Sequence, residues 1–298
     1  MVPLFANQAG QQLLTSLREI FSERRVHCRQ DRFFIFVCGG GLETSFRKRF
    51  IDWAEHNLPK FICLKAEDAF KDSFAGEGRT FVNFANFESV IADIADCVLI
   101  FPESEGSFAE TGFFAKSEVG KKTLVVNPLS HQTDESFLNR GPIDTINRIS
   151  FLQPAIHIDS DGPSINFAPI GERLKARVKS PEHPERLPFR TFNKFTLKHK
   201  LLIVFEILRL LRLADIHTLR YVLKACFGGD PQHEQLKSLL RILQAARFIQ
   251  REEQYFKVVA GIDLVDIKHF EIERIFAQVT LFYLRHSKEL YDALLEAT

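Results

Sequence analysis

Three glutamates lie close together in FPESEGSFAETGFFA, residues 101–115, directly after the apolar run ADCVLI, residues 95–100. Glu103 and Glu105 precede Gly106, and Glu110 follows it. A carboxylate at the end of a buried strand can act as a nucleophile or as a general acid or base. It can equally cap the next helix, because Ser107 followed three residues later by Glu110 fits the Ser-x-x-Glu capping box. The spacing leaves both interpretations open.

Other acidic residues follow or precede neighbouring apolar runs. Glu67 and Asp68 come after the run 61–64, and Glu88 precedes the run 98–101. Each alone is commonly a solvated or capping acid, but together with the glutamates of residues 103–110 they would line one crevice. Crowded carboxylates raise one another's pKa, and such perturbed groups gather at functional sites.

The elements that must position these acids alternate between apolar strands and helices. We predict a parallel sheet covered by helices on both faces, because the strands are continuous apolar runs rather than alternating ones. In such α/β folds ligands bind outside the carboxyl ends of the strands, where the acidic segment falls. The expected strands are 33–38, 61–64, 98–101, 123–126 and 155–158, and the expected helices are 5–25, 44–56, with Thr44 as its cap, 81–95 and 107–120.

Gly39, Gly40 and Gly41 follow the first of these strands. Glycines there let backbone N–H groups approach a phosphate or sugar closely. The run is not GxGxxG, and no Lys-Ser/Thr follows it as a P-loop requires. A tight turn between strand and helix explains the glycines nearly as well.

The later part of the chain has a different pattern. SPEHPERLP, residues 180–188, holds three prolines and predicts a linker. Helices are expected at 199–213, 215–229 and 231–246, followed by a hairpin at 247–259 and a helical tail. Three helices followed by a hairpin form a winged helix-turn-helix, whose third helix enters a major groove. Lys237 and Arg241 lie opposite the leucine stripe of that helix, and Arg247 follows it.

Charge is divided unevenly along the 298 residues. Residues 1–171 carry 17 Lys and Arg against 22 Asp and Glu, whereas residues 172–257 carry 18 against 9. A basic face attracts phosphate backbones, so we expect nucleic acid to bind the later part through Lys237, Arg241 and Arg247. The alternative is a winged helix used only for protein contacts.

Composition excludes several classes of protein. The five cysteines form no CxxC pair and no metal-binding spacing, which suits a reducing cytosol and predicts no metal. The N-terminal residues lack the charged region and long apolar core of a signal peptide, and no apolar run is long enough to span a bilayer. We therefore expect a cytoplasmic protein without a membrane partner.

Four motifs carry a resemblance to a known family: FVCGG (36–40), AEDAF (66–70), FESV (87–90) and FPESEGSFAETG (101–112). With the following strand they resemble the nucleoside 2-deoxyribosyltransferases. The whole chain resembles more closely the deoxyribosyltransferase-like effector proteins of bacterial retrons, which pair such a domain with a winged-helix DNA-binding domain. The resemblance covers residues 30–130 by motif and 190–260 by architecture.

The resemblance implies roles for individual residues. Glu110 takes the position of the nucleophile that attacks the sugar C1′, and Glu88 that of an acid contacting the base. Serine at 104, where the transferases have an acid, leaves room for a ribosyl substrate, and NAD is the leading candidate among nucleotides. No separate cofactor is implied. The implied substrate-binding residues are Gly39, Gly40, Gly41, Glu67, Asp68, Ser104, Glu105, Gly106 and Ser107.

The resemblance also implies an organisation and a setting. Residues 1–28 would be a helical extension, 29–179 the catalytic domain, 180–190 the linker and 191–298 the winged-helix domain with its tail. The protein would be an antiphage N-glycosidase toxin, a homo-oligomer controlled by the retron reverse transcriptase and its RNA–DNA product (msDNA). Two alternatives remain: a DNA-binding regulator whose first domain only senses a nucleotide, and a structural subunit.

Overall fold

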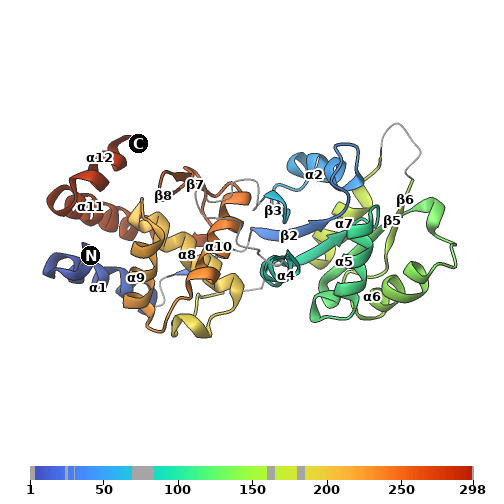
Figure 1. Ribbon diagram of the computed structural model, residues 1–298, viewed down its shortest axis with the longest axis horizontal. Coiled ribbons are helices and arrows are strands. Elements are labelled where there is room, and N and C mark those ends of the chain that lie inside the picture. The colour runs from blue at the N-terminus through green and yellow to red at the C-terminus, as the bar shows by residue number, and fades with distance from the viewer. Residues whose placement is uncertain are drawn as a thin grey trace. The chain divides into compact units, whose positions relative to one another are not determined.

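The computed structural model describes residues 4–23, 26–29, 31–68, 84–159, 165–179 and 185–296. The chain forms two compact units (Figure 1). Residues 31–180 form an α/β unit, and residues 1–30 together with 181–298 form a helical unit.

Five parallel strands form the sheet of the α/β unit, in the order β3-β2-β4-β5-β6. Side chains of β4 are buried along its whole length, as are most of those in β2 and β5, so the sheet is covered on both faces. This confirms the parallel sheet predicted from the continuous apolar runs. The strands are β2 (Phe33–Cys38), β3 (Phe61–Leu64), β4 (Cys97–Ile100), β5 (Thr123–Pro128) and β6 (Ile156–Ile158).

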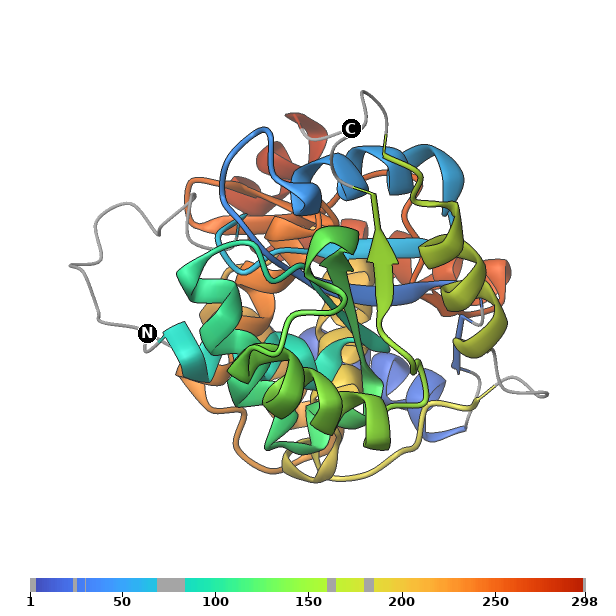
Figure 2. The same cartoon turned by 90° about the vertical axis from the view of Figure 1, so that its right-hand side faces the viewer.

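Helices pack on the two faces of this sheet (Figure 2). Ile35, Val37 and Leu99 share one hydrophobic core with α2 (Phe46–Asn57) and α7 (Ala168–Arg177). Side chains alternate along a strand, so Phe36 points to the other face, where its ring meets that of Phe114 edge-on with centroids 6.2 Å apart. The helices of that second face are α4 (Phe84–Ile94), α5 (Glu105–Ala115) and α6 (Asp144–Ile149).

The strand order reverses between β2 and β4. The chain runs from β2 to β3 on one side and then returns to β4 on the other side of β2. Cys38, the last residue of β2, pairs with Ile100, the last residue of β4. The loops that follow these strands therefore begin side by side, at the point where open α/β sheets bind their ligands.

Two helix starts differ from the sequence predictions. Ser104 rather than Ser107 caps α5, and Ser107 is its reciprocal partner: Ser104 Oγ accepts the Ser107 N–H at 3.3 Å, and Ser107 Oγ accepts the Ser104 N–H at 2.9 Å. Ser45 rather than Thr44 caps α2. The sequence offers two hydroxyl residues within three positions of each other at both places, and only the backbone path decides which one is the cap.

The helical unit is built around α8 (Leu197–Leu211), whose side chains are buried almost all round from residue 200 to 211. Asp215 caps α9 and Gly228 ends it. A third helix and a hairpin follow, as the sequence predicted. These elements and the two tail helices are α9 (Ile216–Phe227), α10 (His233–Ala245), β7 (Ile249–Glu252), β8 (Tyr255–Val258), α11 (His269–His286) and α12 (Lys288–Glu296).

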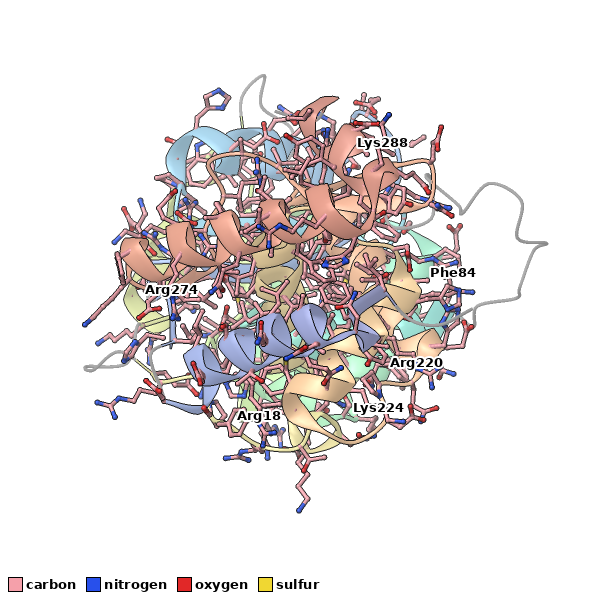
Figure 3. The ribbon with its side chains drawn as sticks, turned by 90° about the vertical axis from the view of Figure 1, so that its left-hand side faces the viewer. Arg18, Phe84, Arg220, Lys224, Arg274 and Lys288 are labelled. Carbon is pink, nitrogen blue, oxygen red and sulfur yellow. The ribbon has the colours of Figure 1, made fainter. Side chains whose placement is uncertain are left out.

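The N-terminal helix α1 (Gln8–Ser22) belongs to this same unit and packs on α9 and α11. Phe5, just before it, stacks on Phe282 of α11 with ring centroids 4.9 Å apart. Figure 3 views the helical unit from the side of α1, α9 and α11 and labels Arg18, Arg220 and Lys224 at the surface.

The two passages of the chain into and out of the α/β unit lie side by side within the helical unit. Leu187 donates its N–H to the Val26 carbonyl at 3.0 Å, and Cys28 donates its N–H to the Glu185 carbonyl at 2.8 Å. On its other side β1 (His27–Cys28) pairs with β9 (Val265–Asp266). Residues 26–28 are thus held between two neighbouring segments.

One carboxylate is buried in the core of the helical unit. Glu206 of α8 is fully buried, and its oxygens accept from Arg209 Nη2 at 2.7 Å and Nε at 2.9 Å. Arg209 also pairs with Asp263 at 2.5 Å. Removing one partner of such a pair would leave the other charge buried and uncompensated, so the loss of either residue would be strongly destabilising. Among the residues described, no helix combines the length and the apolar character needed to cross a membrane.

Candidate active site

Glu110 lies in the second turn of α5, on the side that faces the end of β2. Because Ser107 forms the capping box with Ser104, Glu110 has no part in starting the helix. Its Oε2 atom is buried and has no hydrogen-bond partner among the residues that the structure describes. The capping interpretation of this glutamate is therefore wrong. A buried carboxyl oxygen without a partner is costly, which makes it a candidate for a ligand contact.

A second carboxyl, that of Glu88 on α4, lies close to Glu110. Burial, and then the nearby Glu88 carboxylate, raises the pKa of Glu110 to about 7. Burial also raises the pKa of Glu88, the Glu67 carboxylate adds to this, and a hydrogen bond with Glu110 opposes it. Two carboxyls in such surroundings share protons near neutral pH, so that one can be ionised while the other is protonated.

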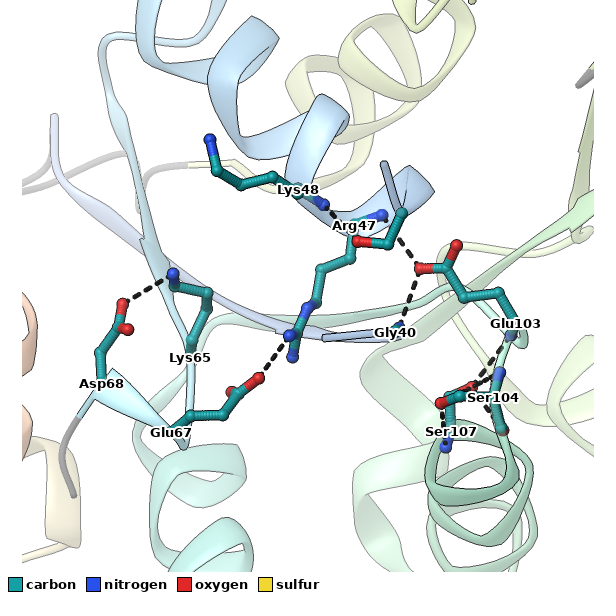
Figure 4. Close-up of polar contacts among 10 residues, drawn as sticks. Gly40, Arg47, Lys48, Lys65, Glu67, Asp68, Glu103, Ser104 and Ser107 are labelled. Atoms are coloured by element: carbon teal, nitrogen blue, oxygen red, sulfur yellow. Dashed lines mark hydrogen bonds and ion pairs between the residues drawn. The ribbon is translucent and has the colours of Figure 1, made fainter. Parts of the chain in front are cut away.

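Arg47, in the first turn of α2, brings positive charge to this pair. It is 8% exposed, its guanidinium donates to the Glu67 carboxylate, and its charge lowers the pKa of Glu110. Figure 4 shows its side chain extending from α2 towards Glu67. The sequence analysis missed Arg47. A signal was present, because Arg47 falls on the same helical stripe as the buried Phe50, Ile51 and Ala54.

The thiol of Cys38, the last residue of β2, contacts Glu110. The sequence patterns did not indicate this residue either. Burial raises the pKa of this thiol well above its usual range, and the charges of Glu110 and Glu88 raise it further. Cys38 therefore remains an S–H group, and its hydrogen bond to Glu110 lowers the pKa of that carboxyl. Its burial at the end of an apolar strand gave no sign of this contact.

The Glu103 carboxylate is occupied by backbone hydrogen bonds and so has a structural role. Its oxygens accept the backbone N–H groups of Gly40 at 2.9 Å and Arg47 at 3.2 Å (Figure 4). They also accept the N–H of Phe46 at 2.7 Å. These groups belong to the glycine turn and to the N-terminus of α2, where a negative charge is favourable. Glu103 thus fixes the start of α2 against the loop after β4, and with it the position of Arg47.

The glycine turn holds α2 close instead of presenting all its N–H groups to a ligand. The Gly40 N–H is bound to Glu103, as described above. A Cβ at Gly39 would come within 2.8 Å of the Arg47 Cβ and 2.9 Å of Glu103 Oε1, so glycine permits this close approach. Only at Gly41, of the three, would an added Cβ meet nothing within 4 Å.

The remaining predicted site residues divide into two groups. Glu67 is brought to the carboxyl pair through Arg47, whereas Asp68 pairs with Lys65 at 2.9 Å. Ser104 and Ser107 bond each other at the helix start. Glu105 and Gly106 lie exposed in the first turn of α5.

In the helical unit the predicted basic residues lie on α10 and just beyond it. Lys237 is 12% exposed at its side chain and lies 3.5 Å from Glu234, and Arg241 is half-buried. Arg247 is exposed, with a left-handed backbone (φ 58°), in the tight connection that leads from α10 to β7. Lys237 and Arg241 thus lie one turn apart on α10, and Arg247 lies just beyond the end of that helix.

Comparison with known proteins gives one matching family and two relatives. The model of the STM3845 retron effector protein family matches residues 43–251. The Retron Ec73 protein of Escherichia coli is 28% identical over 311 aligned residues, which cover 92% of this chain and 93% of the relative. The Retron Ec86 protein of Escherichia coli is 27% identical over 154 residues, which cover 49% of this chain and 47% of the relative. Both are named "putative ribosyltransferase/DNA-binding protein".

The family match spans well over half of the chain. It includes Arg47, Glu88 and Glu110 as well as helices α8, α9 and α10 of the helical unit, and it ends within β7. This chain therefore belongs to the STM3845 retron effector protein family.

Proposed function

We propose that the α/β unit is an N-glycosidase that cleaves the bond between base and ribose in a nucleotide, with NAD as the leading candidate. The observation that carries this proposal is the buried, unpartnered oxygen of Glu110, beside Glu88 and Arg47 at the carboxyl ends of the central strands. Breaking an N-glycosidic bond requires a carboxylate below C1′ and, for most bases, an acid near the leaving nitrogen.

In the proposed reaction the Glu110 carboxylate attacks C1′. The C1′–N bond breaks with its electron pair going to the base, and a C1′–O bond forms to Glu110 or an oxocarbenium ion is held there. Water then attacks C1′, releases Glu110 and loses one proton to solvent; a second base in place of water would give transfer. Arg47 favours the ionised form of Glu110 that this attack needs.

Glu88 is the proposed acid. The hydrogen bond between the two carboxyls raises the pKa of Glu110 and lowers that of Glu88, so the proton that they share passes from Glu110 to Glu88 before the attack. Glu88 would protonate the nitrogen of a neutral leaving base such as adenine. The nicotinamide of NAD already carries its positive charge on that nitrogen and leaves as a neutral molecule without a proton. Glu88 is therefore needed as an acid when a neutral base such as adenine leaves, but not when nicotinamide leaves.

Substrate contacts are proposed at the edge of this cluster. Glu67 has 42% of its side chain exposed, and Gly41 and Glu105 face open space. Hydroxyl groups of a ribose are good partners for such carboxylates. The family's relatives are named as ribosyltransferases, which agrees with a sugar-directed site.

We further propose that α8, α9, α10 and the β7–β8 hairpin form a winged helix-turn-helix that binds nucleic acid, with the retron reverse transcriptase and msDNA as partners. Support comes from the element order, the basic excess and the DNA-binding part of the relatives' names. Replacing Lys237, Arg241 and Arg247 with Gln should weaken binding to duplex DNA. The slope of log K against log salt concentration should become shallower by the amount expected for about three lost phosphate contacts. Binding that keeps the full salt dependence would contradict this assignment.

Glu110→Gln tests the enzymatic proposal. Purified protein is incubated with NAD, nucleosides and deoxynucleotides, and the released base is measured by chromatography. Glu118→Gln is the matched control, because Glu118 is an exposed glutamate of the same unit and pairs with Lys121 at 2.6 Å. Loss of base release in Glu110→Gln alone supports the proposal. Nucleotide binding without base release by the unaltered protein would instead favour a regulator that senses the nucleotide.

A further inference from the structure

A cluster of metal-binding residue types lies in the helical unit, apart from the carboxyl pair. Cys28 and Glu185 lie opposite each other in the antiparallel pairing described above, in which His27 bridges to Arg186. Residues directly opposite in such a pairing carry their side chains on the same face, with Cβ atoms about 4.5–5.5 Å apart. The backbone therefore holds the Cys28 thiol and the Glu185 carboxylate side by side.

His199 completes the cluster from the first turn of α8. Its backbone N–H donates to Thr196 Oγ1 at 3.2 Å, which fixes the start of the helix. Its Nε2 lies 3.3 Å from Glu185 Oε1. One donor atom each from Cys28, Glu185 and His199 lie within 4.8 Å of one another. Three segments far apart in the sequence thus direct their donor atoms to one point.

We propose that Cys28, Glu185 and His199 form a three-ligand binding site for Zn²⁺, with water in the fourth position. Sulfur, imidazole and carboxylate are the donors that Zn²⁺ takes, whereas Mg²⁺ and Ca²⁺ take oxygen alone. With Zn–N and Zn–O bonds of about 2.0–2.2 Å, a tetrahedral site separates its nitrogen and oxygen by about 3.3–3.5 Å. The observed 3.3 Å needs no rearrangement of that pair.

The charges at the cluster are compatible with a dication. A thiolate and a carboxylate together balance the two positive charges of Zn²⁺, and the Cys28 proton leaves to solvent. Arg190 and Lys198 lie near His199, and the neutral complex would be affected little by them. His199 has 16% of its side chain exposed and Glu185 55%, so a metal can enter from solvent.

No sequence motif indicates this site. The spacing from 28 to 185 to 199 matches no short metal motif, and the sequence analysis accordingly predicted no metal. Metal binding should stabilise the folded protein. The metal would join the segment that leaves the helical unit, the segment that returns to it and the start of α8. At a free metal concentration 100 times the Kd, the ratio of folded to unfolded protein should rise about 100-fold.

The test uses the full chain, freed of metal with a chelator and titrated with Co²⁺, which replaces Zn²⁺ and reports thiolate ligation by a charge-transfer band in the near ultraviolet. One equivalent should give this band and the visible absorption of tetrahedral Co²⁺, and Zn²⁺ should abolish both. Cys28→Ser should remove the charge-transfer band, and Glu185→Gln and His199→Gln should weaken binding at least tenfold. Cys63→Ser, a cysteine outside the cluster, is the matched control.

The midpoint temperature of thermal unfolding is measured during the same titration. Zn²⁺ should raise this temperature in the unaltered protein and in Cys63→Ser only. Should Cys28→Ser fail to fold, Glu185→Gln replaces it, because that side chain is more than half exposed. An unaltered protein that gives no thiolate band, or a band that Glu185→Gln and His199→Gln leave unchanged, would overturn the proposal and leave only a hydrogen bond between Glu185 and His199.

Discussion

Replacing Arg47 with Gln should move the pH dependence of catalysis upwards. Arg47 supplies positive charge to the carboxyl pair, and it lowers the pKa of Glu110, which stands at about 7 with the guanidinium in place. An opposite charge within 4–6 Å is worth roughly 1.4–4 kcal/mol to an ionised carboxylate. The variant also frees the Glu67 carboxylate from its partner, and its charge acts on Glu88 in the same direction.

The size of the effect follows from the fraction of Glu110 that is ionised. With a pKa of about 7, half of the carboxyl is ionised at pH 7. Losing about 1.4–4 kcal/mol leaves between one tenth and one thousandth ionised, so activity at pH 7 should fall roughly 5- to 500-fold. Because the pKa is raised, the lost activity should return as pH increases. Arg47→Lys keeps the charge and should show a smaller shift.

The assay is the pH dependence of kcat/KM for base release, measured by chromatography over a range on both sides of neutrality. Lys48→Gln is the control, since that neighbouring residue pairs with Asp52 at 2.5 Å. Thermal unfolding checks that the variant is folded. An acid limb at the same pH in Arg47→Gln and in the unaltered protein would refute the reasoning, as would a loss of activity equal at every pH.

Three further changes have distinct expected outcomes. Glu88→Gln should reduce release of adenine from its nucleosides by about 10²–10⁴-fold and release of nicotinamide from NAD far less, compared by chromatography; equal losses would contradict its role as an acid. A glutamine at 103 cannot accept all three N–H groups, because its NH₂ group only donates, so Glu103→Gln should lower the free energy of unfolding in urea by about 1.5–3 kcal/mol; an unchanged value would contradict this structural role. Arg209→Met should cost about 3–5 kcal/mol, and replacing Glu206 with Met as well should recover much of it; a double variant no more stable than the single one would argue against a buried charge.

The sheet could be predicted from sequence because its strands are continuous apolar runs. Residues 33–38 and 61–64 were predicted with the bounds that the structure has, and 98–101 was displaced by one residue. The strand ends then placed Glu110 at the correct edge of the sheet. Periodicity and local turn residues are short-range properties, and they suffice for this much.

The contacts that complete the site are long-range, and the sequence did not contain them in readable form. Glu103 binds the Gly40 N–H across 63 residues of chain. Arg47 reaches Glu67 only because β2 and β3 are neighbours in the sheet. The start of α5 was misplaced because Ser104 and Ser107 are both good caps, and the capping box formed between them rather than with Glu110.

The side-by-side passage of residues 26–28 and 185–187 makes the α/β unit an insertion within a helical protein. Its two ends are joined to strands a few ångströms apart, so a short loop could replace the whole α/β unit without stretching the chain. Such an architecture would allow the α/β unit to be exchanged for another domain while the helical unit keeps its own hydrophobic core.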